Sequence, residues 1–204
     1  MSVKPGVLLV VSGPSGAGKS TALAKIIAGR KDAVFSVSAT TRPLRPGESE
    51  GVHYMAVSDG QFSELLSKNE LLEWAEYAGH RYGTPAAPVM AALDAGKVIV
   101  LDIDVAGALQ VAEKCTEAVL VFFTPSTLAE VERRLRDRGT ETEEKIGARI
   151  KAAREEYKYI GRYRYMVIND NLDDAVHDLS AVIDAELRIV PRMGRHISDL
   201  LESV

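Results

Sequence analysis

The chain has 204 residues, of which 46% are hydrophobic and 26% are charged. This length and composition predict a globular protein with one α/β core and room for insertions. The formal net charge of −4 argues against a general affinity for nucleic acid polymers or anionic membranes, so any anion site must be a local cluster of cations. The single cysteine, Cys115, excludes an intrachain disulfide and fits a reducing compartment. The apolar run at 7–11 is too short for a signal peptide or a membrane span, and we expect a cytoplasmic protein.

A strand, a glycine-rich loop and a helix are predicted at the start of the chain. Residues 7–12 form an apolar, β-branched run, and residues 19–27 contain no proline or glycine. The loop between them fits the pattern G-x-x-x-x-G-K-[ST], and its glycines let backbone N–H groups turn inward around phosphate oxygens. Lys19 adds a positive charge near the β- and γ-phosphates, and Ser20 offers a hydroxyl to Mg²⁺. The alternative, a chance glycine-rich turn, is disfavoured by four fixed positions and the correct flanks. The predicted ATP-binding residues here are Gly13, Pro14, Ser15, Gly16, Ala17, Gly18, Lys19, Ser20 and Thr21.

A segment of different character follows a short second strand predicted at 33–37. Within it, residues 51–57 and 71–77 are predicted strands, and Ser58 with Gln61 forms a capping box for a helix through residue 68. Thr84 and Pro85 mark the start of a further helix, which ends at Gly96. We therefore expect an inserted small sheet with a helix, with Trp74 in its core.

The rest of the chain alternates strands and helices. Residues 98–104 are predicted to form a buried parallel strand that ends in carboxylates, and residues 119–123 and 165–168 two more core strands. An amphipathic helix is predicted at 126–138 and a closing helix at 172–190. Between them, Thr140 and Glu143 form a predicted capping box for a further helix, whose apolar stripe runs from Ile146 to Tyr157. The alternation predicts a parallel sheet with helices on both faces and ligands at the C-terminal edge of the strands. Beyond residue 191 the tail is expected to form a short helix or to remain loose.

A second anion site is predicted at the beginning of the insertion. Arg42 and Arg45 lie three residues apart between prolines, and arginine binds phosphate oxygens in a bidentate way. Taken alone, this loop is better interpreted as a solvated basic surface. Tyr54 and Tyr82 favour the phosphate site, because each can donate a phenolic O–H, and Glu73 and Asp102 remain available for other contacts.

An ordered set of motifs resembles guanylate kinases over about residues 5–190. The motifs are the phosphate loop, 38–48 with its T-T-R-P-x-R-P-G-E pattern, 51–54, 70–75, 82–84, 101–104, 138–142 and 167–170. The resemblance implies a P-loop three-layer α/β fold with a central parallel sheet, an inserted small α+β nucleotide-monophosphate-binding domain and a helical lid. It implies the following segments: 1–37 core with the phosphate loop, 38–96 GMP-binding insertion, 97–136 core, 137–160 lid, and 161–204 core with the C-terminal helix and tail.

The resemblance also assigns residues to the GMP site. It implies that Arg42, Arg45, Tyr54 and Tyr82 bind the phosphate, that Ser38, Glu73, Thr84 and Asp102 or Asp104 recognise guanine, and that Glu48 belongs to the same site. The chemistry supports Glu73, since a carboxylate accepts both the N1–H and the 2-amino group of guanine, whereas adenine presents an acceptor at N1. The alternative for Glu73 is a solvated carboxylate on a strand face.

The expected reaction is direct in-line transfer from ATP to GMP or dGMP, assisted by Mg²⁺ held by Ser20 and Asp102. The predicted catalytic cations are Lys19, Arg42, Arg134, Arg138 and Arg149, the last three on a segment that resembles the lid of nucleoside monophosphate kinases. Asn169 is expected near adenine, and Arg133 and Arg136 on the solvated helix face. Two alternatives remain: a non-catalytic phosphopeptide-binding module of the same family, and a P-loop kinase for another small phosphorylated substrate. The sequence leaves the oligomeric state open.

Overall fold

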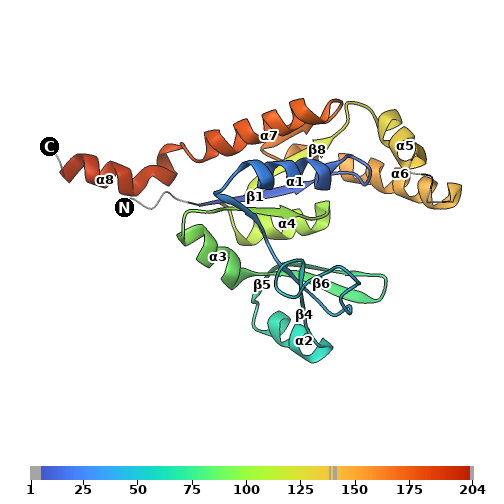
Figure 1. The fold of residues 1–204 in the computed structure, drawn as a ribbon, viewed down its shortest axis with the longest axis horizontal. Coiled ribbons are helices and arrows are strands. Elements are labelled where there is room, and N and C mark those ends of the chain that lie inside the picture. Colours follow the sequence, from blue (N-terminus) through green and yellow to red (C-terminus); the bar gives the residue numbers. More distant parts are fainter. Residues whose placement is uncertain (1–5, 138, 140–141, 203–204) are drawn as a thin grey trace.

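A five-stranded parallel sheet forms the core of the computed structural model, which describes residues 6–137, 139 and 142–202 (Figure 1). Its strand order is β2-β7-β1-β8-β9, and every adjacent pair is parallel. The carboxyl ends of all five strands therefore lie at one edge of the sheet, where ligands bind in such folds. The strands are β1 Val7–Ser12, β2 Ala33–Phe35, β7 Val98–Asp102, β8 Val119–Thr124 and β9 Tyr165–Ile168.

Helices cover both faces of this sheet because its central strand is apolar on both sides. Val7, Leu9 and Val11 of β1 pack in the cluster that includes residues of α1 (Lys19–Gly29) and α7 (Leu172–Glu186). Leu8 and Val10 face the opposite cluster, with residues of α3 (Ala86–Asp94) and α4 (Val105–Lys114). The expected α/β architecture is confirmed.

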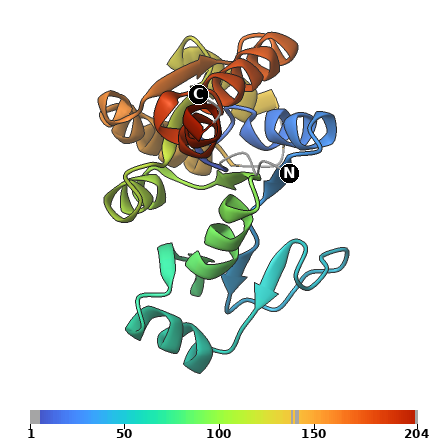
Figure 2. The same ribbon diagram turned by 90° about the vertical axis from the view of Figure 1, so that its left-hand side faces the viewer.

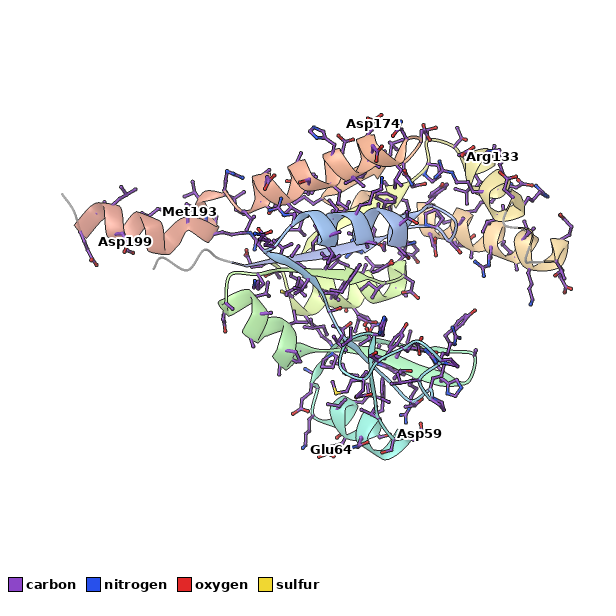
Figure 3. The ribbon with its side chains drawn as sticks, in the orientation of Figure 1. Asp59, Glu64, Arg133, Asp174, Met193 and Asp199 are labelled. Carbon is purple, nitrogen blue, oxygen red and sulfur yellow. The ribbon has the colours of Figure 1, made fainter. Side chains whose placement is uncertain are left out.

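A second, four-stranded sheet lies beside the core, with strand order β4-β3-β6-β5 (Figure 2). Its strands are β3 Ser38–Thr40, β4 Tyr54–Ala56, β5 Leu71–Tyr77 and β6 His80–Pro85. Helix α2 (Asp59–Ser67) begins at the predicted Ser58–Gln61 capping box and packs Phe62 against Ala39 and Leu71. Asp59 and Glu64, labelled in Figure 3, mark this helix at the end of the molecule farthest from the main sheet.

Two further helices follow β8 and pack on each other through Val131, Leu135 and Ile146. They are α5 (Leu128–Asp137) and α6 (Glu143–Tyr157), and a short 3₁₀ turn, η1 (Ile160–Arg162), leads from α6 to β9. The chain ends in η2 (Val190–Met193) and α8 (Gly194–Glu202), which extends away from the body of the molecule. Within the described part of the chain, no helix has the length and apolar character needed to span a membrane.

Several sequence predictions were wrong in detail. Residues 98–104 do not form one strand: β7 ends at Asp102, and the unpredicted helix α4 begins at Val105. Strands β3 and β6 were not predicted, and the strand expected at 51–57 is confined to β4. The closing helix ends at Glu186 and not at residue 190, whereas the tail does form one of its two expected structures, the short helix α8. Trp74, expected in the core, is 38% exposed.

The cap of α6 was also mispredicted. Its N-cap is Thr142, whose side chain accepts a hydrogen bond from the backbone N–H of Lys145, and not Thr140, which lies outside the described residues. The stripe along α6 is confirmed, because Ile146 and Ala153 are buried and Ile150 packs against the same cluster as Ile146.

Candidate active site

The phosphate loop joins β1 to α1 at the ligand-binding edge of the main sheet. Gly13 has φ +142°, and a Cβ on it would lie 2.1 Å from the carbonyl oxygen of Phe123. Gly18 has φ +89°, and a Cβ there would lie 2.5 Å from Nδ2 of Asn169. Both positions therefore require glycine, for backbone conformation and for space. Asn169, the residue that follows β9, donates through its side-chain amide to the Ala17 carbonyl at 2.6 Å and so stabilises the loop.

The loop encloses a cavity of 390 Å³. Lys19 lines it, and its Nζ donates to the carbonyl oxygen of Gly13 at 2.5 Å. Burial lowers the pKa of Lys19, and the charges of Asp102, Glu156 and Asp104 oppose this shift. A phosphate that replaced the Gly13 carbonyl as partner of Lys19 would add an opposite charge and favour the charged ammonium.

Two candidate oxygen ligands lie next to each other in the lining of this cavity. The hydroxyl of Ser20 donates to Oδ2 of Asp102 at 2.8 Å, and both residues line the cavity. Among the described residues there is no group of three or more His, Cys, Asp or Glu side chains that could hold a metal on their own. The hydroxyl and the carboxylate fit Mg²⁺ instead as a partial set, since this ion commonly takes one or two protein oxygens and completes its shell with phosphates and water.

A second cavity, also of 390 Å³, opens between the inserted sheet and the end of β7. Arg42 lines it and is held in a fixed orientation, with its Nη2 3.0 Å from both carboxylate oxygens of Glu48 and its Nε 3.2 Å from the Tyr82 hydroxyl. The guanidinium also stacks over the ring of Tyr54, 5.4 Å from its centroid. Arg45, Tyr54 and Tyr82 line the same cavity, so cations and phenols converge there.

Glu48 organises the arginine loop. Besides binding Arg42, its Oε2 accepts the backbone N–H of Arg45 at 2.7 Å. That backbone bond and the Arg42 guanidinium lower the pKa of Glu48. The carboxylate is therefore already occupied by the loop's own donors, which favours a supporting role for Glu48 over the expected direct contact with a ligand.

Glu73 lines the same cavity and is only 5% exposed. It pairs with Thr84 across the antiparallel strands β5 and β6, and its Oε1 accepts the Thr84 hydroxyl at 2.6 Å. Burial raises the pKa of Glu73, and nearby Asp104 adds to the shift, while the Thr84 hydrogen bond opposes it. Thr84 itself is fully buried and reaches the cavity through Glu73, while Ser38 lines the cavity directly.

The two cavities meet at the end of β7. Asp102, Ile103 and Asp104 line both of them. Asp104 is also the N-cap of α4, because its Oδ1 accepts the backbone N–H of Gly107 at 2.7 Å. A group bound in one cavity is thus adjacent to a group bound in the other.

A sequence model of guanylate kinases matches residues 6–186. The chain belongs to the guanylate kinase family. It is 46% identical over 187 residues to the guanylate kinase of Caldanaerobacter subterraneus subsp. tengcongensis and 45% identical over 186 residues to that of Halalkalibacterium halodurans, and each alignment covers 91% of both chains. The crystal structure of guanylate kinase from Anaplasma phagocytophilum matches with a TM-score of 0.75 and 33% identity, over 98% of this chain and 95% of that chain.

Two of the three predicted lid arginines lie on the helices that follow β8. Arg149 of α6 donates to the Ser15 hydroxyl of the phosphate loop at 2.5 Å. Arg134 of α5 donates to the carbonyl of Asn169 at 2.8 Å and to that of Ala17 at 3.4 Å, so it contacts the backbone of the phosphate loop at Ala17. The third, Arg138, lies outside the described residues.

The two arginines assigned to the solvated face are confirmed there. Arg133 pairs with Glu130 and Asp137, and Arg136 pairs with Glu132 and Glu143. Both arginines are exposed, and their partners are carboxylates of α5 and the start of α6.

Sequence reasoning missed Glu156, which lines the phosphate cavity from α6. Its buried Oε2 has no hydrogen-bond partner among the described residues, and burial raises the pKa of the carboxyl while the charge of Lys19 opposes the shift. No sequence motif surrounds Glu156. The one indication that it is buried is its position next to Tyr157, the last residue of the predicted apolar stripe.

Proposed function

We propose that this chain is a guanylate kinase, which transfers the γ-phosphoryl group of ATP to GMP or dGMP and releases ADP and GDP or dGDP. The observation that carries the proposal is the meeting of two different cavities at Asp102 and Asp104. One contains the phosphate loop, and the other contains an arginine pair together with a buried carboxylate. Such an arrangement suits a donor triphosphate and an acceptor monophosphate bound end to end.

In the acceptor cavity, the proposal assigns the phosphate of GMP to Arg42, Arg45, Tyr54 and Tyr82. The Arg42 guanidinium supports this assignment, because Glu48, Tyr54 and Tyr82 already fix its plane and little side-chain entropy remains to be lost on binding. Glu48 then acts by holding Arg42 and the Arg45 backbone.

The guanine base is assigned to Glu73, with Ser38, Thr84 and Asp104 around it. A carboxylate that accepts the N1–H and the 2-amino group of guanine would face the N1 lone pair of adenine instead. Because Glu73 is buried, the wrong base leaves its carboxylate with the Thr84 hydroxyl but without the two donors of guanine, and discrimination on the order of 10⁴-fold is reasonable for such a pocket. The Thr84 hydroxyl orients the carboxylate for this task.

In the donor cavity, the proposal assigns the ATP phosphates to the loop at 13–21. Lys19 exchanges the Gly13 carbonyl for phosphate oxygens, and Ser20 and Asp102 hold Mg²⁺. The ion, when bound, neutralises charge on the β- and γ-phosphates. Asn169, whose amide donates to the Ala17 carbonyl of the loop, is assigned to the side on which adenine binds.

The chemistry needs no nucleophile from the protein. An oxygen of the GMP phosphate attacks the γ-phosphorus, a new P–O bond forms, and the bond to the β-phosphate oxygen breaks to release ADP. The residues position the two nucleotides in line and neutralise the charge that develops between them. Lys19, Arg42, Arg134, Arg138 and Arg149 are the proposed cations.

Residues 38–96 are proposed as the GMP-binding domain and residues 137–160 as a lid over the phosphates. The hydrogen bond between Arg149 and Ser15 supports the lid, because it connects α6 with the phosphate loop. Closure would exclude water that otherwise hydrolyses ATP. Purine nucleotide metabolism in the cytoplasm is the proposed setting, in keeping with a single cysteine.

The alternatives are disfavoured on specific grounds. A non-catalytic module has no use for Lys19, Ser20 and Asp102 around a phosphate cavity. A kinase for another small phosphorylated substrate would not need a buried carboxylate and Thr84 at the base end of the second cavity.

The test is the ratio of kcat/KM for GMP to that for AMP in the wild type and in Glu73→Gln. The proposal expects this ratio to fall by at least about 100-fold in the variant, because the amide presents a donor to guanine N1–H. The same ratio in both proteins would refute the role of Glu73.

A further inference from the structure

Strand β5, which carries Glu73, is an edge strand of the inserted sheet. It has β6 as its neighbour on one side and, within the described part of the chain, no strand on the other, where α4 of the core packs instead. An edge strand presents unpaired N–H and C=O groups along its free side. How those groups are satisfied determines how firmly Glu73 is held.

The register of β5 is irregular at the residue before Glu73. Leu71 pairs with Pro85 and Glu73 pairs with Thr84, so two steps along β5 correspond to one step along β6. A bulge of this kind re-aims the neighbouring side chains and disrupts the local ladder. Here Leu71, Leu72 and Glu73 are all buried, so the alternation of exposed and buried side chains is broken at the point where the carboxylate must face the cavity.

Side chains of α4 bind the backbone on both sides of this bulge. The amide of Gln110 accepts the N–H of Trp74 at 3.1 Å and donates to the C=O of Trp74 at 3.0 Å. The Lys114 ammonium donates to the C=O of Leu71 at 2.7 Å. Gln110 thus makes the pair of bonds that a neighbouring strand would make, and does so at the residue that follows Glu73.

The same face of α4 also touches the carboxylate. A Cβ on Gly107 would lie 3.1 Å from Oε2 of Glu73, so the helix backbone forms a wall against that oxygen. Gly107, Gln110 and Lys114 are spaced three and four residues apart and therefore share one helix face. This face runs along β5 and connects Glu73 with the end of β7.

We propose that Gln110 is a positioning residue for recognition of the guanine base. It fixes the Trp74 backbone to α4 and thereby holds the adjacent Glu73 carboxylate in the orientation that accepts the two donors of guanine. The inference rests on the proposed function of Glu73. Gln110 is not among the described residues that line the two cavities, so its action is through β5.

The test compares Gln110→Met, which keeps the length of the side chain and loses both hydrogen bonds, with Ser58→Ala. Ser58 caps α2 in the same inserted unit through its bonds with Gln61, so this control reports a general loss of stability of that unit. In Gln110→Met we expect the Kd for GMP, measured by calorimetry, to rise about tenfold, as the loss of two backbone hydrogen bonds allows. The kcat at saturating GMP and the Kd for ATP should stay within about twofold of wild type. Ser58→Ala should change none of these values.

The decisive comparison repeats Gln110→Met in the Glu73→Gln background. If Gln110 acts through Glu73, the second substitution should change the Kd for GMP by less than about threefold there. A tenfold change in both backgrounds, or no change in the wild-type background, would overturn the proposal. A normal GMP-to-AMP ratio in Glu73→Gln would refute the base-reading role itself, which separates that failure from a failure of Gln110 alone.

A second variant covers the case in which Gln110→Met does not fold. Gln110→Glu retains the acceptor for the Trp74 N–H, loses the donor to its carbonyl and adds a negative charge. We expect a smaller rise in the Kd for GMP, about threefold, again without a change in the Kd for ATP. An unchanged Kd for GMP in this variant would count against the inference.

Discussion

Replacing Glu73 by glutamine should make the nucleotide-free protein more stable at neutral pH. Glu73 is 5% exposed, and burial raises the pKa of its carboxyl group, with a further contribution from Asp104. The folded chain therefore binds a proton at Glu73 more readily than the unfolded chain does. In glutamine, Oε1 can still accept the Thr84 hydroxyl, and no charge has to be buried.

The sign of the pH dependence follows from this shift. Below the pKa of Glu73 in the unfolded chain, near 4.5, the carboxyl is neutral in both states, and the shift costs nothing. As the pH rises through the raised pKa of the folded state, the wild type loses stability, at about 1.4 kcal/mol for each unit by which that pKa is raised. We expect Glu73→Gln to exceed the wild type by about 1 kcal/mol in free energy of unfolding at pH 7.5.

Urea unfolding without nucleotides, at several pH values between 4.5 and 8, measures this difference. The gap between the two proteins should shrink steadily as the pH falls. Glu76→Gln is the matched control, since Glu76 is an exposed carboxylate on the same strand, and we expect it to change stability by less than about 0.5 kcal/mol. A Glu73→Gln protein that is less stable than wild type at pH 7.5, or a gap that does not depend on pH, would refute the reasoning.

Three further predictions concern the phosphate cavity. Arg149→Ala should lower kcat at least tenfold, whereas Arg133→Ala, on the solvated face of α5, should leave it within about twofold; equal steady-state rates for the two would contradict the lid assignment. Asp102→Asn should raise the Mg²⁺ concentration that gives half-maximal rate at least about fivefold, and an unchanged Mg²⁺ titration would exclude Asp102 from the ion. Gly13→Ala should lose about 3 kcal/mol or more in urea unfolding, because its Cβ would collide with the Phe123 carbonyl at a positive φ; a stability equal to wild type would mean that the loop relaxes freely.

The sequence predicted the core strands and the phosphate loop because their signals are local. The run at 7–12 is apolar on both faces, as a central parallel strand must be, and the loop's glycines and Lys19 follow it directly. The capping box at Ser58 and Gln61 is also local, and its two hydrogen bonds are present. These elements are fixed by residues that lie within one turn or one strand of each other.

Elements that depend on tertiary contacts were missed. Strand β6 contains a glycine and ends in a proline, and it forms because β3 and β5 pair with it from both sides. Helix α4 contains Gly107 and follows the strand after two residues, and its small, buried side chains gave no clear helical stripe. Missing α4 also hid the pairing of Gln110 with Trp74.

In the candidate site, too, residues with a local sequence signal were predicted and contacts between distant segments were not. Arg42, Arg45 and Glu73 were predicted from residue type and resemblance, whereas the supporting bonds from Glu48 and the buried position of Glu156 depend on how distant segments pack. Spacing along the chain reports which chemical groups are available. It does not report which of them are already occupied by another side chain.

The most direct test of the account is one coupled assay of ADP release from ATP and Mg²⁺, with GMP, AMP, UMP and CMP offered in parallel to the wild-type chain. The account predicts rapid turnover with GMP and a kcat/KM for AMP lower by about 10⁴-fold. No turnover with GMP would contradict catalysis and favour a binding module. Comparable turnover with AMP or a pyrimidine nucleotide would contradict the reading of guanine by Glu73.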